Sequence, residues 1–286
     1  MKVRVTCFWD DDSTLLGQLS RYAFGKAQWK DMQLVTNEDY DVLVILTSPH
    51  PSLKEYNKEK AVTLLTEPPQ SAHIQGEDQS GKVPVYLHLP FWGNIPDEEI
   101  KHLSNTGVPK SELLSAVTSE LGYMEGHQLR LQVIYHLSQK INEGFDLWGK
   151  KYTNHFFEKI HAYRGELTNK YDGLWDYQYH FACENTFIDN YFTEKLTDPI
   201  LAEALCFYDG CQNIEDFIDP RSFIRINVQD PVTATERIIQ AINDEEWEQR
   251  IPYIREQKQR LLRDLNPLNI IWLAASGQDV IKACKL

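Results

Sequence analysis

The residues from 177 to 223 place charged and polar side chains between apolar runs, at spacings typical of strands and helices that surround a ligand site. Thr193, Glu194 and Lys195 form a consecutive triplet at the start of a predicted helix, directly after a polar loop. Backbone N–H groups at a helix N-terminus and a lysine ammonium group can together bind a diphosphate. The triplet therefore predicts a phosphate-binding site. The alternative is a capping box that carries a surface lysine.

Glu184 and Asn185 follow directly on the apolar run at residues 180–183. Open α/β sheets place their ligand contacts at the carboxyl ends of the strands, so these two residues stand where a ligand contact is expected. The Asn185 amide can bind a hydroxyl group or a base. The alternative is a buried carboxylate and amide that hold the loop together through hydrogen bonds.

Arg130 lies near the start of a helix that is predicted to follow Gly126, one position from the apolar stripe that begins at Leu129. A guanidinium group donates two parallel hydrogen bonds and is therefore a natural partner for a departing diphosphate. We predict that Arg130 binds the diphosphate. The alternative is an arginine on the protein surface.

Glu67 follows a strand-like apolar run and precedes Pro68 and Pro69. A carboxylate that is held rigidly at the end of a strand is a candidate general base. The alternative is a turn whose only role is to end the strand.

Two motifs in this chain resemble the donor-sugar signature of the α1,3-fucosyltransferase-like glycosyltransferases, glycosyltransferase family 10. The first is F-x-x-E-N-[ST] at residues 181–186, and the second is Y-x-T-E-K at residues 191–195. The resemblance implies that Glu194 holds the nucleotide ribose, that Lys195 binds the phosphates, and that Asn185 and Tyr191 contact the donor. Glu184 belongs to the same predicted donor-binding set.

The resemblance is weaker around Arg130 and Glu67. The family has an arginine in the strand-to-helix region that corresponds to Arg130, but the usual preceding S-N motif is missing from this chain. The family also has a G-E-N-x-x-P segment at the place of Glu67, and its glutamate is thought to deprotonate the acceptor hydroxyl. Here the Gly and Asn are replaced, and the D-Y-x-x-x-F-D that usually follows is missing. The resemblance implies the role of general base for Glu67.

The function implied by the resemblance is that of an inverting glycosyltransferase, which moves L-fucose from GDP-fucose to a hydroxyl group of a glycan acceptor. Arg130 and Lys195 would stabilise the charge on the departing diphosphate, so we expect neither a metal nor a cofactor. Two alternatives stay open: the same fold with another nucleotide sugar such as UDP-xylose, and a non-enzymatic sugar-nucleotide or glycan-binding protein. The motifs from residue 177 onwards and the lack of an export signal disfavour a flavodoxin-like or periplasmic-type binding module.

Three consecutive carboxylates, Asp10, Asp11 and Asp12, suggest the D-x-D motif with which another glycosyltransferase architecture binds a metal ion. They end the first predicted strand, and Asp12 with Ser13 favours a helix cap instead. The histidines lack H-E-x-x-H spacing and the closest pair of cysteines has no second pair, so the sequence does not predict a zinc site. We expect the three aspartates on the acceptor side.

Apolar periodicity predicts the elements that position these residues. In the first half we expect a helix at residues 12–26 and strands at 3–9, 40–47, 61–66 and 84–89. In the second half we expect strands at residues 113–118, 145–148, 179–183, 205–208 and 223–228. Helices are expected after Gly126, from residue 193, at 232–242 with Asp230 as the N-cap, and at 247–265. Pro199 predicts that the helix from residue 193 restarts with Asp198 as a new cap.

Strands that alternate with helices predict a mostly parallel sheet in each half. We expect an N-terminal Rossmann-like acceptor-side domain at residues 1–110, a C-terminal Rossmann-like nucleotide-sugar-binding domain at 111–265, and a tail at 266–286 that packs back on the first domain. The fold class is therefore α/β. The resemblance implies the GT-B arrangement, in which two Rossmann-like domains face each other across a cleft.

Composition and charge narrow the functional classes. The chain has 286 residues, 42% of them apolar, which suits a soluble globular protein. Its 29 basic and 42 acidic residues give a net charge of -13, which disfavours nucleic acid as a partner. No run approaches the roughly 18 to 20 apolar residues that cross a bilayer, and the first residues lack a signal-peptide core. Five cysteines, an odd number, suit a reducing compartment, so we expect a cytoplasmic protein without a transmembrane anchor.

Overall fold

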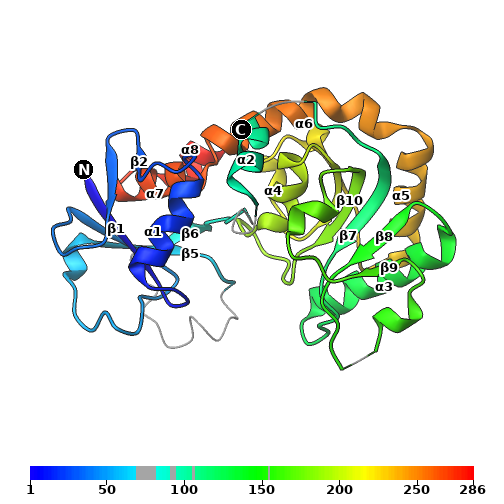
Figure 1. The fold of residues 1–286 in the computed structure, drawn as a ribbon, viewed down its shortest axis with the longest axis horizontal. Helices are drawn as coiled ribbons and strands as arrows, with labels where there is room; N and C mark the ends of the chain where they lie inside the picture. Colours follow the sequence, from blue (N-terminus) through cyan, green and yellow to red (C-terminus); the bar gives the residue numbers. More distant parts are fainter. Residues whose placement is uncertain (69–81, 91–94, 105–106, 154) are drawn as a thin grey trace. The chain divides into compact units, whose positions relative to one another are not determined.

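The computed structural model describes residues 1–68, 82–90, 95–104, 107–153 and 155–286. The chain forms two compact units: unit 1 comprises residues 1–93 and 260–286, and unit 2 comprises residues 94–259. Each unit is built on one six-stranded sheet with helices packed against it (Figure 1). Pro69, which follows Glu67 and Pro68 in the sequence, lies outside the described residues.

Unit 1 has the strand order β2-β3-β1-β4-β5-β6, and its strands are parallel except for the short β2–β3 pair. Buried positions run continuously through β1 from Val3 to Cys7, including the polar Arg4 and Thr6, as expected for a strand that is covered on both faces. The strands are β1 (Lys2–Cys7), β2 (Gln28–Trp29), β3 (Met32–Val35), β4 (Val42–Leu46), β5 (Ala61–Leu65) and β6 (Lys82–Tyr86). The helices include α1 (Asp12–Arg21), α7 (Pro267–Ala275), α8 (Val280–Cys284) and a 3-10 turn, η1 (Lys58–Lys60).

The C-terminal segment of the chain is part of unit 1. Asn266 donates a hydrogen bond to the carbonyl of Tyr22 at 2.9 Å, and Nε2 of His88 lies 2.6 Å from the carbonyl oxygen of Leu265. Beyond this point α7 packs against β4 and β5, so the red helix α7 lies with the blue strands in Figure 1. The N-terminal part of the chain therefore forms the sheet of unit 1, and the C-terminal part helps to cover it.

Unit 2 has the strand order β12-β11-β10-β7-β8-β9, and all its neighbouring strands are parallel. The strands are β7 (Glu112–Val117), β8 (Phe145–Trp148), β9 (Tyr163–Gly165), β10 (Tyr177–Cys183), β11 (Leu205–Asp209) and β12 (Phe223–Arg225). The α-helices include α2 (Asp97–Ile100), α3 (Glu125–Lys140), α4 (Glu194–Leu201), α5 (Pro231–Asn243) and α6 (Glu246–Arg263), which continues into unit 1. Short 3-10 turns are η2 (Lys101–Ser104), η3 (Phe157–Lys159), η4 (Lys170–Gly173), η5 (Ile214–Asp216) and η6 (Pro220–Ser222).

The strand order of unit 2 contains a topological switch between β7 and β10. From β7 the chain proceeds outward to β8 and β9, whereas from β10 it proceeds in the opposite direction to β11 and β12. The segments that leave the carboxyl ends of these two central strands lead to α3 and α4, respectively. Open α/β sheets bind ligands at such a switch, because the diverging connections leave room there.

The predicted strands and helices are confirmed in position, with differences at their ends. The helix expected at residues 12–26 ends at Arg21, because the N–H groups of Phe24 and Gly25 bond back to the carbonyls of Arg21 (3.0 Å) and Ser20 (2.9 Å). Phe24 takes a φ of 54°, so this is a Schellman end without glycine at the left-handed position. The strand expected at residues 223–228 stops at Arg225, because the N–H of Val228 bonds the Asp209 side chain at 2.9 Å.

The helix restart predicted at Pro199 is wrong. α4 runs unbroken from Glu194 to Leu201, with Thr193 as its N-cap. Pro199 removes the hydrogen bond that the Lys195 carbonyl would accept within the helix. The thiol of Cys206, on the adjacent strand β11, lies 3.9 Å from that carbonyl oxygen and donates to it. The helix ends two residues after Pro199, which limits the distortion.

The predicted N-cap of α5 is confirmed. Asp230 caps α5 by accepting a hydrogen bond from the N–H of Thr233 at 3.1 Å, and Pro231 is the first helical residue. The five cysteines are free thiols and all are buried. Within the described ranges, no helix combines the length and the apolar character that spanning a membrane requires.

Candidate active site

Most of the polar residues singled out in the sequence meet at the carboxyl edge of the unit 2 sheet, beside the topological switch. The end of β10 supplies Glu184 and Asn185, the start of α4 supplies Glu194 and Lys195, and the second turn of α3 supplies Arg130. These residues come from segments far apart in the sequence. The parallel pairing of β10 with β7 and β11 brings the segments together.

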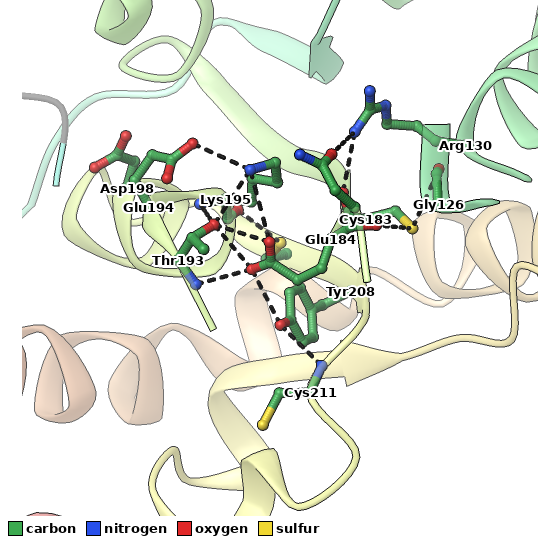
Figure 2. Close-up of polar contacts among 12 residues, drawn as sticks. Gly126, Arg130, Cys183, Glu184, Thr193, Glu194, Lys195, Asp198, Tyr208 and Cys211 are labelled. Carbon is green, nitrogen blue, oxygen red and sulfur yellow. Dashed lines mark hydrogen bonds and ion pairs between the residues drawn. The ribbon is translucent and has the colours of Figure 1, made fainter. Parts of the chain in front are cut away.

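Glu184 is the centre of the hydrogen-bond network in Figure 2, and it is fully buried. Its carboxylate accepts hydrogen bonds from the backbone N–H of Thr193 at 2.8 Å and from the Thr193 hydroxyl at 2.9 Å. The hydroxyl of Tyr208, on β11, donates to the same carboxylate at 3.2 Å. Burial raises the pKa of Glu184, while Lys195 and the Thr193 hydrogen bonds oppose that rise. This carboxylate therefore ties the end of β10 to the first turn of α4.

The ammonium group of Lys195 lies between two carboxylates. Its Nζ atom is 3.6 Å from Oε2 of Glu184 and 3.4 Å from Oε1 of Glu194, and it donates to the Thr193 hydroxyl at 3.3 Å. Burial disfavours the charged form, but Glu194 and Glu184 outweigh burial and raise the pKa of Lys195. The side chain keeps 23% of its surface exposed. Lys195 is thus a charged group that a ligand can reach.

Glu194 is ionised and partly exposed. Burial alone would raise its pKa, but Lys195 and Lys170 outweigh burial and lower the pKa to about 2. Lys170 Nζ lies 3.8 Å from the Glu194 carboxylate and 2.8 Å from that of Asp198, which is fully buried on α4. Since 29% of the Glu194 side chain is exposed, its oxygens can accept hydrogen bonds from a ligand.

The guanidinium of Arg130 points at the end of β10. It donates to the carbonyl of Cys183 at 3.2 Å and to Oδ1 of Asn185 at 3.3 Å. The residue is only 4% exposed, and its Nε–H has no hydrogen-bond partner among the described residues. The alternative of a surface arginine is therefore wrong. Arg130 thus has a buried donor without a described partner at the same edge of the sheet as Lys195.

Gly126 allows α3 to approach β10 closely enough for these contacts. A Cβ atom at this position would lie 2.0 Å from the carbonyl oxygen of Glu184 and 2.9 Å from the Cα atom of Asn185. Real Cβ atoms do not come that close to backbone atoms, so any larger residue would push the start of α3 away. The sequence marked Gly126 only as the start of a helix. The close contact is with Glu184, 58 positions further along the chain, so no local sequence pattern could predict it.

His127 is a buried neighbour of the site that the sequence did not indicate. Burial, together with the nearby charges of Arg130 and Lys195, lowers its pKa to about 4. Its Nδ1 atom accepts the backbone N–H of Met124 at 3.4 Å, which requires that nitrogen to be unprotonated. The neighbouring ring of Tyr123, 74% exposed, meets the imidazole edge to face at 4.7 Å. His127 is neutral and adds no charge to the site.

Tyr191 lies in the segment between β10 and α4, and its side chain is buried. This segment is held to the loop after β11 by Asn190 and Asn213, which exchange two hydrogen bonds of 2.7 and 2.9 Å. The backbone of Tyr191 also bonds the thiol of Cys211. The structure fixes the position of Tyr191, and its contact with a donor stays a prediction.

Glu67 lies in unit 1, directly after β5 and Thr66, and is half-buried. The hydroxyl groups of Thr66 and Thr47 are 2.7 Å apart, and the N–H of Thr66 donates to the Thr47 hydroxyl at 2.9 Å. The residue before Glu67 is therefore fastened to the end of the neighbouring strand β4.

The three consecutive aspartates also lie in unit 1. The cap of α1 is Asp11, which accepts from the N–H groups of Ser13 and Thr14 at 2.9 and 3.1 Å, so the prediction of Asp12 as cap is wrong by one residue. Asp12 instead forms an ion pair with Arg4 at 2.6 Å. Among the side chains that the structure describes, no three His, Cys, Asp or Glu residues are grouped as metal ligands would be.

A family model described as glycosyltransferase family 10 (fucosyltransferase) C-term matches residues 109–254, about half of the chain. The matched range contains the sheet of unit 2 and every site residue from Arg130 to Lys195. A comparison with curated protein sequences gives no match.

Solved structures share the fold over nearly the whole chain. A crystal structure of an α1,3-fucosyltransferase aligns with a TM-score of 0.53 and 15% identity, covering 98% of this chain and 91% of the other. The DNA-modifying enzyme β-glucosyltransferase aligns with a TM-score of 0.55 and 10% identity, covering 96% of this chain and 100% of the other. WaaG, a glycosyltransferase of lipopolysaccharide biosynthesis, aligns with a TM-score of 0.50 and 10% identity, covering 96% and 99%. These are GT-B glycosyltransferases, so the predicted α/β fold class is confirmed.

Proposed function

Because this chain belongs to glycosyltransferase family 10, the fucosyltransferase family, we propose that it transfers L-fucose from GDP-fucose to a hydroxyl group of a glycan. Membership of this family makes the protein a glycosyltransferase. The proposal concerns the donor, the acceptor and the inversion of configuration at the anomeric carbon. Structures that share its fold include α1,3-fucosyltransferases with GDP and with GDP-fucose, which supports a nucleotide-sugar donor.

The observation that carries the proposal is the convergence of two cations and two helix N-termini at the switch point of unit 2. Arg130 is on the second turn of α3, and Lys195 is on the first turn of α4. Helix N-termini attract phosphate through their unpaired N–H groups and the helix dipole. Arg130 adds a buried guanidinium whose Nε–H has no partner among the described residues, and Lys195 adds a charged, partly exposed ammonium.

Arg130 and Lys195 would bind the diphosphate of the donor. When the bond between the sugar and the diphosphate breaks, negative charge grows on the leaving GDP, and both cations are already in place to stabilise it. Cationic side chains that are already in position stabilise a negative charge more strongly in a partly buried site than in water. This arrangement supports departure of GDP without a metal ion.

Glu194, Asn185 and Tyr191 would select and orient the donor. The pKa of Glu194, about 2, keeps it ionised at neutral pH, so its two oxygens can accept hydrogen bonds from the vicinal hydroxyls of the ribose. The Asn185 side chain is half-buried, and its Oδ1 accepts a hydrogen bond from Arg130. Its amide N–H₂ group would bind the donor. Tyr191 would contact the donor from the adjoining segment.

Glu184 would serve the donor site indirectly. Its carboxylate is fully buried and is engaged by Thr193, Tyr208 and Lys195. The alternative of a buried carboxylate that holds the loop agrees with these contacts. We therefore assign Glu184 the task of positioning Lys195 and the first turn of α4.

Glu67 would act as the general base in unit 1, while unit 2 holds the donor. In the proposed step the acceptor oxygen forms a bond to the anomeric carbon as the bond from that carbon to the phosphate oxygen breaks. The leaving GDP takes the electron pair, and the acceptor proton goes to the Glu67 carboxylate. A single displacement of this kind inverts the anomeric configuration.

Calorimetric titration of the protein with GDP, GDP-fucose, UDP and UDP-xylose, with and without a divalent cation, tests the donor. Binding of GDP and GDP-fucose in preference to the uridine nucleotides supports the proposal. Preference for UDP or UDP-xylose would replace the donor. For the base, Glu67→Gln should lose turnover and still bind GDP as the unchanged protein does, whereas full turnover in this variant would remove Glu67 from the mechanism.

A further inference from the structure

Thr47 stands at the end of β4 in a backbone conformation that threonine rarely adopts. Its φ is 65°, in the left-handed region, where a β-branched residue is a steric outlier. The N–H of Ser48 donates to the carbonyl of Leu46 at 2.8 Å, so these three residues form a γ-turn with Thr47 at its centre. A γ-turn with positive φ at its centre is the strained form of this turn. The residue is 1% exposed, so the turn is buried.

Three contacts of Thr47 hold the strained turn to β5 and to Thr66, the residue that follows this strand. Its N–H donates to the carbonyl of Leu64 at 2.8 Å, and its hydroxyl accepts from the N–H of Thr66 at 2.9 Å. The same hydroxyl lies 2.7 Å from the hydroxyl of Thr66. Two of these contacts use the side chain, and both end on the residue directly before Glu67.

The choice of threonine at this position has a physical consequence. Glycine and asparagine adopt positive φ at lower cost than threonine, so the backbone alone would favour them. What threonine adds is a short hydroxyl group that reaches the backbone of residue 66. Strain that the surrounding structure maintains is found mainly where a functional group must be held in place.

We propose that Thr47 is a positioning residue for Glu67: its strained turn directs the hydroxyl onto Thr66 and thereby fixes the direction from which the Glu67 carboxylate projects. This inference rests on the proposed role of Glu67 as general base. A base must keep hydrogen-bond reach of the proton that it removes, and an error of about 1 Å in such a geometry can reduce the rate on the order of a hundredfold.

Three substitutions at position 47 separate the hydroxyl from the backbone strain. Thr47→Ser keeps the hydroxyl, Thr47→Val keeps the β-branched shape without the hydroxyl, and Thr47→Gly removes both the hydroxyl and the strain. With GDP-fucose as donor, and water or a glycan panel as acceptor, GDP release measures turnover. We expect kcat to fall by about tenfold to a hundredfold in Thr47→Val and Thr47→Gly and to be largely retained in Thr47→Ser. The KM for GDP-fucose should stay unchanged in all three.

Thermal unfolding distinguishes positioning from a merely structural role. Thr47→Gly loses the hydroxyl that pairs the Thr66 N–H but relieves the strained φ, so it should unfold at a higher temperature than Thr47→Val while its kcat is reduced at least as much. A structural role would instead make kcat follow stability, with Thr47→Gly more active than Thr47→Val. Hydrogen exchange at the Thr66 amide gives a readout without turnover: faster exchange is expected in Thr47→Val and Thr47→Gly, and the original rate in Thr47→Ser.

The outcomes distinguish this inference from the function on which it rests. Wild-type kcat in Thr47→Gly, or unchanged Thr66 exchange in Thr47→Val, would overturn the positioning role even if Glu67→Gln is inactive. Full turnover in Glu67→Gln would overturn both the role of Glu67 as general base and the positioning role of Thr47. Loss of kcat in Thr47→Val with recovery in Thr47→Ser, beside an inactive Glu67→Gln, is the result that the inference requires.

Discussion

The Glu184 carboxylate lies 3.6 Å from the Lys195 ammonium, and Glu184 is wholly buried while 23% of the Lys195 side chain is exposed. Thr193 joins the two, since its hydroxyl contacts both side chains. The partly exposed Lys195 ammonium is thus held in place by a carboxylate that lies in the protein interior. Removing the buried partner should therefore affect both stability and ligand affinity.

The first prediction concerns Glu184→Ala. This change removes the acceptor of the Thr193 N–H and leaves Lys195 with Glu194 as its remaining close carboxylate. We expect the free energy of unfolding to fall by about 2 to 4 kcal/mol, because buried donors lose their partner. GDP affinity should also fall. Chemical denaturation and calorimetry measure the two effects, with Glu143→Ala at an exposed position as the control. A Glu184→Ala protein with unchanged stability would show that the network contributes little.

The second prediction uses two glycines in the same segment. Gly126→Ala would place a Cβ atom 2.0 Å from the Glu184 carbonyl oxygen, whereas a Cβ atom at Gly122 would have no neighbour within 4 Å. Gly126→Ala should lower stability by about 1 to 3 kcal/mol and weaken GDP binding, since the start of α3 must move away from β10. Gly122→Ala should change neither property. Equal behaviour of the two variants in unfolding and titration experiments would contradict the close approach.

The third prediction is a dependence of stability on pH through Glu194. Its folded pKa of about 2 lies below the ordinary value of 4.5, because Lys195 and Lys170 outweigh the effect of burial. A lowered carboxyl pKa stabilises the fold above pH 4.5, and this contribution disappears as pH falls from 4.5 toward 2. The difference in unfolding temperature between the unchanged protein and Glu194→Gln should therefore be constant near neutral pH and shrink below pH 4.5. A difference that grows on acidification has the opposite sign and would refute the assignment.

The fourth prediction is that His127 stays neutral well below pH 6.5. Burial and the charges of Arg130 and Lys195 lower its pKa to about 4. The neutral form is therefore favoured in the folded state, and the stability that this provides above pH 6.5 is lost as pH falls from 6.5 toward 4. The Cε1–H resonance of His127, followed by NMR, should begin to shift only below about pH 5. A midpoint near pH 6.5 would mean that the imidazole is exposed to solvent.

Local patterns in the sequence were sufficient for most of the larger elements and for the residues in motifs, but they did not locate β3, β9 or α7. Apolar runs located β4, β5 and β10, and the T-E-K triplet located the start of α4. These features depend on neighbours in the chain, which a single sequence contains. The unbroken α4 was not predicted, because the Cys206 thiol that bonds the Lys195 carbonyl belongs to the next strand.

Parts of the site that depend on distant contacts could not be predicted. Gly126 matters because of the Glu184 carbonyl, and His127 is neutral because folding buries it beside two cations. The same holds for Thr47, which ends an apolar run and was expected to continue the strand. Its γ-turn is stabilised by Thr66, on the segment that follows the neighbouring strand. The sequence therefore indicated the candidate site residues, and the structure shows which distant contacts hold them in place.

The central claim is that Lys195, at the start of α4, binds the diphosphate of a guanosine nucleotide. Calorimetric titration of GDP into the unchanged protein, Lys195→Met and Lys140→Met tests it most directly, since Lys140 lies exposed at the far end of α3. Loss of one charge-assisted contact should raise the Kd of Lys195→Met by about tenfold to a hundredfold. Lys140→Met should bind as the unchanged protein does. Equal GDP affinity in Lys195→Met and the unchanged protein, or no GDP binding by either, would contradict the account.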